Sequence, residues 1–320
     1  MIESLGIEFI KYLQSMHNEI SPIMELLAIL VKVEFSFVFV VPLLFWNSRP
    51  NLIAPLYALL MVDVMLGDIL KVILAQPRPF WIADIIAIDK VTSVYSSPSG
   101  YSSLSTVFWG YFYLHLRHKA ILPIGCIFIL STGLSKMYHA SMMPDHMVLG
   151  IIQGCLVLWL YWKYESKIAL FIKQSTIQQW LLMVFSVIGL AYGAMYIAFL
   201  IHDTYQIPLQ YIEYKMIASQ RFAGGGITMS AGFFIGSTIG FKRLITTKSD
   251  IQTLSRMSRI ALSVTGLAVV IVLMVIIRTI LIDSVDSRIQ QWLINIIVTS
   301  LSSYWIFYSA PIRFIRASST

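Results

Sequence analysis

The chain has 320 residues, of which 58% are hydrophobic and only 12% are charged, and its mean hydropathy is +0.77. Charged residues make up about a quarter of a typical soluble domain, so this composition excludes a water-soluble enzyme or binding module. The formal net charge of +7 comes from basic residues spread over short loops, which favours a membrane protein over a nucleic-acid-binding one.

Residues 1–20 differ from the rest of the chain. They contain three glutamates and a single lysine, without the basic start and small-residue cleavage site of a signal peptide. Their apolar residues recur at helical spacing, at Ile2, Leu5, Phe9 and Leu13. This pattern predicts an amphipathic helix that lies on the membrane surface.

After this segment, apolar stretches long enough to cross about 30 Å of hydrocarbon recur along the whole chain. Backbone groups in lipid must bond within their own segment, and these stretches are too long and too continuously apolar for barrel strands. The sequence therefore predicts an all-α, polytopic membrane helical bundle of about nine transmembrane helices, near residues 22–46, 51–75, 101–117, 119–138, 146–165, 178–201, 222–241, 258–282 and 289–309.

Lys and Arg are unevenly divided between the two sets of alternate loops. One set holds more than half of them, and the positive-inside rule makes that side cytoplasmic. We therefore expect the loops around 76–100, 139–146, 202–221 and 283–288 on the outer face. In a Gram-negative bacterium this face of the inner membrane is the periplasmic one.

Two predicted spans contain features that the packing of helices must explain. Asp63 and Asp68 lie within the second span, where a charge is costly. We expect them to form structural ion pairs, with Lys71 one turn after Asp68 as its partner. The seventh span has small residues at four-residue spacing, which predicts close helix packing, at Gly232, Gly236 and Gly240.

Three polar stretches lie where a predicted span meets an outer loop. They are residues 71–79, with six residues between Lys71 and Arg78, residues 97–101 and residues 135–146. Phosphate is held by fixed cations, hydroxyls and the amides that open a helix. These stretches supply such groups and predict a phosphate-binding site made from Lys71, Arg78, Ser99, Gly100 and Lys136.

In order, spacing and position, these stretches resemble the type 2 phosphatidic acid phosphatase family, whose motifs read K-x6-R-P, P-S-G-H and S-R-x5-H-x3-D. The third motif is matched mainly by Ser135, Tyr138, Pro144 and Gly150. The resemblance implies a six-helix phosphatase-like core over residues 21–201 and a three-helix membrane extension over 202–320. It also implies that Ser135 contributes to phosphate binding and that the ligand is a lipid phosphate or a polyprenyl phosphate or pyrophosphate.

The positions that carry the chemistry of this family differ here. In the family, one histidine attacks phosphorus, a second protonates the leaving oxygen, and an aspartate orients the nucleophile. Tyr101 stands at the acid position, Met142 at the nucleophile and His146 at the aspartate. A thioether cannot form a phosphoryl intermediate, and a phenol is a poorer proton donor than imidazolium at neutral pH. We therefore expect phosphate binding without the usual histidine mechanism.

Two alternatives stay open at this point. One is an active lipid phosphate phosphatase or phosphotransferase that uses His139 or His146, and the other is a lipid-phosphate transporter, although no inverted repeat is evident. Methionines around these histidines could also form a copper site, but methionine is a common filler between helices. We predict no metal and no cofactor, and we expect membrane lipids, and a protein partner, as binding partners.

Overall fold

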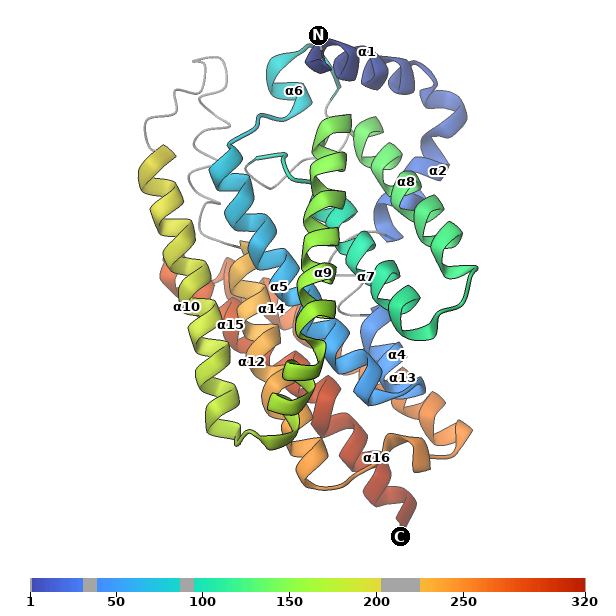
Figure 1. Cartoon of the computed structure of the whole chain (residues 1–320), viewed down its shortest axis with the longest axis vertical. Coiled ribbons are helices and arrows are strands. Elements are labelled where there is room, and N and C mark those ends of the chain that lie inside the picture. Colours follow the sequence, from blue (N-terminus) through green and yellow to red (C-terminus); the bar gives the residue numbers. More distant parts are fainter. Residues whose placement is uncertain (1, 31–38, 87–94, 203–224, 320) are drawn as a thin grey trace. The chain divides into compact units, whose positions relative to one another are not determined.

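A computed structural model describes residues 2–30, 39–86, 95–202 and 225–319 of the chain (Figure 1). Most of the residues in these ranges are helical, and no β-strand occurs in them. The predicted all-α fold is therefore confirmed.

The helices of the described residues follow the predicted spans closely. They are α1 (Ile2–Ser15), α2 (His17–Leu30), α4 (Val41–Asn47), α5 (Pro50–Leu74), α6 (Pro79–Ile82), α7 (Gly100–Leu116), α8 (Ile121–Tyr138), α9 (Pro144–Gln174), α10 (Ile177–His202), α12 (Gly225–Thr246), α13 (Arg256–Ile271), α14 (Arg278–Asp283), α15 (Arg288–Tyr304) and α16 (Ala310–Ser319). A short 3₁₀ helix η3 (Ile251–Thr253) precedes α13, and the π-helical turns η4 (Val272–Ile277) and η5 (Trp305–Ser309) join α13 to α14 and α15 to α16.

Five helical segments among the described residues are long and apolar enough to cross a membrane: Ile121–Tyr138, Pro144–Phe171, Ile177–Ala198, Arg256–Asp283 and Ile289–Ser318. The protein is therefore an integral, multi-pass membrane protein. The number of nine spans stays a prediction. The helices α5, α7 and α12, which stand at three of the expected spans, are not among these five segments. The expected first span includes residues 31–38, and the expected outer loop 202–221 falls almost wholly in 203–224, both outside the described residues.

The chain divides into two compact units that are interleaved in sequence. Unit 1 comprises residues 1–33, 63–163 and 191–224, and unit 2 comprises residues 34–62, 164–190 and 225–320. The boundaries between the units fall inside α5, α9 and α10. The three polar stretches identified in the sequence all lie in unit 1.

In unit 2, α12 packs closely against α15 and η5, as its glycine spacing predicts. A Cβ atom on Gly232 would collide with Thr299 Oγ1, and one on Gly236 would collide with the carbonyl oxygen of Ser300. Ser300 Oγ also donates to the carbonyl oxygen of Gly232, at 3.0 Å. Glycine at these positions therefore allows two helix backbones to approach each other.

In unit 1, α9 approaches α7 in the same way. A Cβ atom on Gly150 would collide with the carbonyl oxygen of Ser99, and one on Gly154 would lie 2.7 Å from the carbonyl oxygen of Ser103. These contacts fix the first turn of α7 against α9. The loop and helix ends that meet there form the candidate site.

Candidate phosphate site

Contacts between the three motif stretches bring them together at one end of unit 1. The backbone N–H of Ser99, in the second stretch, donates to the carbonyl oxygen of His146 in the third, at 3.0 Å. Arg78, in the first stretch, donates to the carbonyl oxygen of Ser141 in the third, at 2.6 Å. A Cβ atom on Gly100 would lie 3.7 Å from Lys71 Nζ. Residues more than sixty positions apart in the sequence are therefore brought together.

The first turn of α7 has the features of an anion-binding helix end. Ser99 is its N-cap, and its hydroxyl accepts a hydrogen bond from the backbone N–H of Ser102, at 3.3 Å. Gly100 opens the helix, and the start of a helix carries the positive end of its dipole. Backbone N–H groups at such a helix start bind phosphate oxygens.

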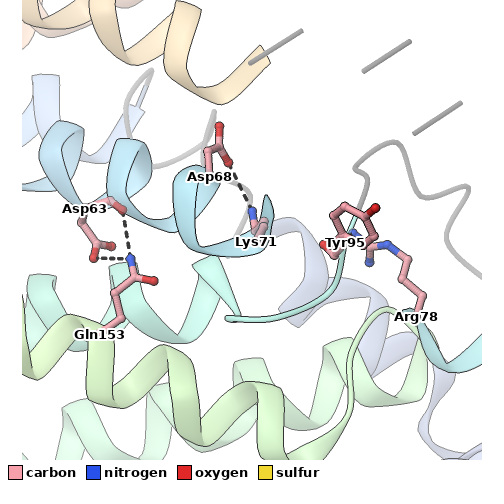
Figure 2. Close-up of polar contacts among 6 residues, drawn as sticks. All are labelled: Asp63, Asp68, Lys71, Arg78, Tyr95 and Gln153. Atoms are coloured by element: carbon pink, nitrogen blue, oxygen red, sulfur yellow. Dashed lines mark hydrogen bonds and ion pairs between the residues drawn. The ribbon is translucent and has the colours of Figure 1, made fainter. Parts of the chain in front are cut away.

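Lys71 lies in the last turn of α5, beside the start of α7. Its ammonium pairs with Asp68 at 3.4 Å, and the two side chains are 22% and 20% exposed (Figure 2). The predicted pairing with Asp68 is confirmed. Since a partly exposed pair of this kind contributes only about 0–1 kcal/mol, a phosphate could take the place of the carboxylate at little cost.

Arg78 is buried and holds the surrounding loops in position. Its Nη1 donates to the carbonyl oxygen of Ser141. Its Nη2 donates to the carbonyl oxygen of Tyr95 at 3.4 Å, and Figure 2 shows these two residues beside each other. The hydroxyl of Ser96 donates to the same Ser141 oxygen, at 2.9 Å. The guanidinium therefore links the first motif stretch to the loops on either side of the site.

Lys136 is also buried, with its ammonium 4.3 Å from the centre of the Tyr101 ring. An ammonium over an aromatic face is stabilised by the quadrupole of the ring. The hydroxyl of Ser135 points elsewhere, because it donates to the carbonyl oxygen of Met24 in α2, at 2.7 Å. The structure thus places Tyr101 against a cation and turns Ser135 toward the N-terminal helices.

The two candidate histidines have different surroundings, although both are buried. His139 Nδ1 donates to the carbonyl oxygen of Ser135 in its own helix, at 2.6 Å. His146 Nδ1 lies 2.8 Å from Ser96 Oγ, and its Nε2 lies 3.7 Å from a carboxylate oxygen of Asp145. Through Ser96, His146 is connected to the carbonyl group that Arg78 binds.

Met142, at the position of the family nucleophile, belongs to an apolar cluster. It is only 3% exposed and packs with Ile10 and Leu13 of α1, and with Tyr138 and Met147. Met137 belongs to the same cluster. Of the four methionines near His139 and His146, three therefore fill apolar space between helices, and the fourth is Met143. Among the residues that the structure describes, no group of three His, Cys, Asp or Glu side chains is arranged to hold a metal ion.

Sequence patterns did not indicate that the N-terminal helices cover the third motif. Figure 1 shows α1 lying across the end of α8. Gln14 Nε2 donates to the carbonyl oxygens of Ile86 and Tyr138, at 2.8 and 3.0 Å, and its Oε1 accepts from the Ile86 N–H. His17 Nδ1 shares a 2.5 Å hydrogen bond with the Tyr138 hydroxyl. No local motif marks Gln14 or His17, because their roles arise only from tertiary packing.

Replacing Gln14 tests this attachment. Gln14→Ala removes three hydrogen bonds, each worth about 0.5–1.5 kcal/mol, so we expect α1 to detach more often from the end of α8. Hydrogen–deuterium exchange of residues 2–15 should then increase. Lys11→Ala, an exposed position on the same helix, is the control and should leave exchange unchanged. Equal exchange in the two variants would contradict a role for Gln14 in holding α1.

The fold and the site define a multi-pass helical membrane protein. At one end of unit 1 a lysine, Lys71, lies beside the first turn of helix α7. A sequence model of the PAP2 superfamily matches residues 51–170, which include all three motif stretches. A model described as the transmembrane extension of PAP2 superfamily phosphatases matches residues 228–319. No curated protein and no solved structure matches the chain. The chain belongs to the PAP2 superfamily and carries its transmembrane extension.

Proposed function

We propose that this protein binds a lipid-linked phosphate or pyrophosphate at the outer membrane face and does not use the usual histidine phosphatase mechanism. The observation that carries the proposal is the contrast between two parts of one site. Lys71 stands beside the open start of α7, whereas Met142 at the nucleophile position is buried in an apolar cluster. This contrast supports a site in which Lys71 and the start of α7 bind a phosphate that no side chain at position 142 attacks.

The choice of a lipid phosphate rests on charge and on location. Lys71 and the first amides of α7 offer a positive charge and N–H donors to a group with several acceptor oxygens. These groups lie at the ends of the spans that the sequence predicts at 51–75 and 101–117, so a ligand anchored by acyl or prenyl chains would present its head group there. The excess of Lys and Arg in the other set of loops supports an outer-face position for this end, which would be the periplasmic side of a bacterial inner membrane.

The absence of the usual mechanism follows from three side chains. Met142 has no nucleophilic nitrogen, and His146, at the position of the family aspartate, carries no orienting carboxylate. Tyr101 lies against the ammonium of Lys136, and a phenol there is a poorer general acid than an imidazolium. A bound phosphate would therefore be held without being cleaved.

Binding and turnover measured together test the proposal. Purified protein in nanodiscs is offered phosphatidate, phosphatidylglycerol phosphate or polyprenyl pyrophosphate, and bound lipid and released phosphate are both quantified. We expect binding without release. Lys71→Ala should weaken binding about 10- to 100-fold, since a charged hydrogen bond contributes about 1.5–3 kcal/mol.

Lys119→Ala, an exposed position before α8, is the matched control for loss of a positive charge and should bind like the wild type. Unchanged lipid binding by Lys71→Ala and Arg78→Ala would show that phosphate is not held at this site.

A working enzyme is the second candidate, and the surroundings of His146 favour it. Its imidazole is buried beside Ser96 and Asp145 and is linked to Arg78 through the Ser141 carbonyl group. If the wild type releases phosphate and His146→Ala or His139→Ala does not, this candidate replaces the first.

A further inference from the structure

A line of buried polar side chains leads from Lys71 into the interior of unit 1, between α5, α7 and α9. On α5, Asp63, Gly67 and Lys71 follow one another at four-residue spacing and so share one face. Gly67 lies against the Gln153 amide of α9. The facing side of α7 supplies four buried hydroxyls, those of Ser99, Ser102, Ser103 and Thr106. The line ends at the carboxyl group of Asp63.

Asp63 is 1% exposed, and Gln153 of α9 is one of its hydrogen-bond partners (Figure 2). Its Oδ1 accepts from the hydroxyl of Ser103 at 2.6 Å and from Nε2 of Gln153 at 2.8 Å. Its Oδ2 and the Oε1 of Gln153 are both buried and have no hydrogen-bond partner among the residues that the structure describes. The expected ion pair of Asp63 is therefore wrong, because its hydrogen-bond partners are a serine and a glutamine.

Such an arrangement is costly for an ionised carboxyl group and suits a protonated one. A charge in the membrane interior and an unpaired buried acceptor both oppose folding. One proton on Oδ2 would remove the charge and convert an unpaired acceptor into a donor. A divalent metal ion takes about six or more oxygen ligands, and no metal-holding cluster occurs in the described part of the chain.

We propose that Asp63 is a proton-binding site whose occupancy is linked to the anion site at Lys71. The proton is exchanged with water on the side of Lys71, the partly exposed residue at the end of this face of α5. The charged residues that follow Asp63 on α5 are Asp68 and Lys71, which pair with each other. The residues that α7 and α9 turn toward it, Ser103 and Gln153, do not titrate.

The linkage between the two sites rests on the proposed function. Lys71 lies eight residues from Asp63, about 12 Å along the helix, and its positive charge favours the ionised carboxyl group. A phosphate bound at Lys71 offsets that charge, so the bound anion favours the protonated carboxyl group. By reciprocity, protonation of Asp63 strengthens anion binding by the same factor.

Infrared spectroscopy of the protein in nanodiscs tests the proton site directly. We expect a carboxylic acid carbonyl band that titrates with pH in the wild type and is absent in Asp63→Asn. It should persist in Asp84→Asn, which alters an exposed acid. Asp63→Glu keeps a carboxyl group one methylene longer and should restore the band at a shifted frequency. An identical band in folded Asp63→Asn, or no band in the wild type at any pH, overturns the proposal.

The same spectra recorded with short-chain phosphatidate test the linkage. The band should grow on binding, at constant pH, in the wild type. Binding without any change in the band would overturn the linkage while leaving the proposed function standing. An Asp63-dependent band together with no phosphatidate binding would instead refute the proposed function and the linkage, and would leave the proton site in place.

Discussion

Gly150→Ala is expected to destabilise the protein and to abolish lipid phosphate binding. The added methyl group would collide with the carbonyl oxygen of Ser99 and would lie 3.2 Å from Ser102 Cβ. The first obstacle is backbone, so the strain can be relieved only by moving the start of α7 away from α9. Overpacking of this kind costs about 1–3 kcal/mol, and the displaced turn carries the amides of the anion site.

Thermal unfolding in detergent and phosphatidate binding measure the two effects. Gly193→Ala is the matched control, because this glycine is also in a predicted span and a Cβ atom there would meet nothing within 4 Å. The control gains helix propensity of up to about 1 kcal/mol and should unfold at an equal or higher temperature. Equal unfolding temperatures and equal binding in the two variants would show that the close approach of α9 to Ser99 does not support the site.

The helical fold could be predicted from the sequence because a lipid bilayer allows few backbone structures. A continuous apolar stretch such as 178–201 must satisfy its backbone internally in lipid, and the structure forms α10 there, at Ile177–His202. The close contact of Gly236 with the Ser300 backbone was likewise indicated by residue size and spacing. These features depend on properties of one segment, which a sequence displays directly.

The position of the candidate site could be predicted from the sequence, but the directions in which its side chains point could not. Motif spacing predicted that Lys71, Arg78 and Ser99 lie near one another, and the three stretches that contain them are in contact. Spacing does not show where a donor points: Arg78 is directed at backbone carbonyl groups, and Ser135 donates to Met24. Nor does it reveal the partners of Asp63, since Ser103 and Gln153 are ordinary polar residues within apolar spans.

The largest expected gain comes from returning the lost chemical groups. Tyr101→His combined with Met142→His restores the acid and the nucleophile of the family motifs, and we expect phosphate release from phosphatidate to rise above the wild-type level. Positioned acid and base groups typically contribute about 10²- to 10⁴-fold. Adding His146→Asp restores the orienting carboxylate, so the triple variant should be faster than the double variant.

The structure also indicates what could limit this gain. Met142 packs beneath Ile10 and Leu13 of α1, so a histidine placed there must be reached by the phosphate past that helix. Gln14→Ala, which loosens α1, should therefore raise release further in the triple variant and have no effect on release in the wild type. The triple variant could fold and bind phosphatidate but release no phosphate, with or without Gln14→Ala. The backbone around residue 142 would then have moved away from the phosphate. Loss of catalysis would then lie in geometry as well as in side-chain chemistry, because a displacement of about 1 Å at a nucleophile is enough to suppress attack.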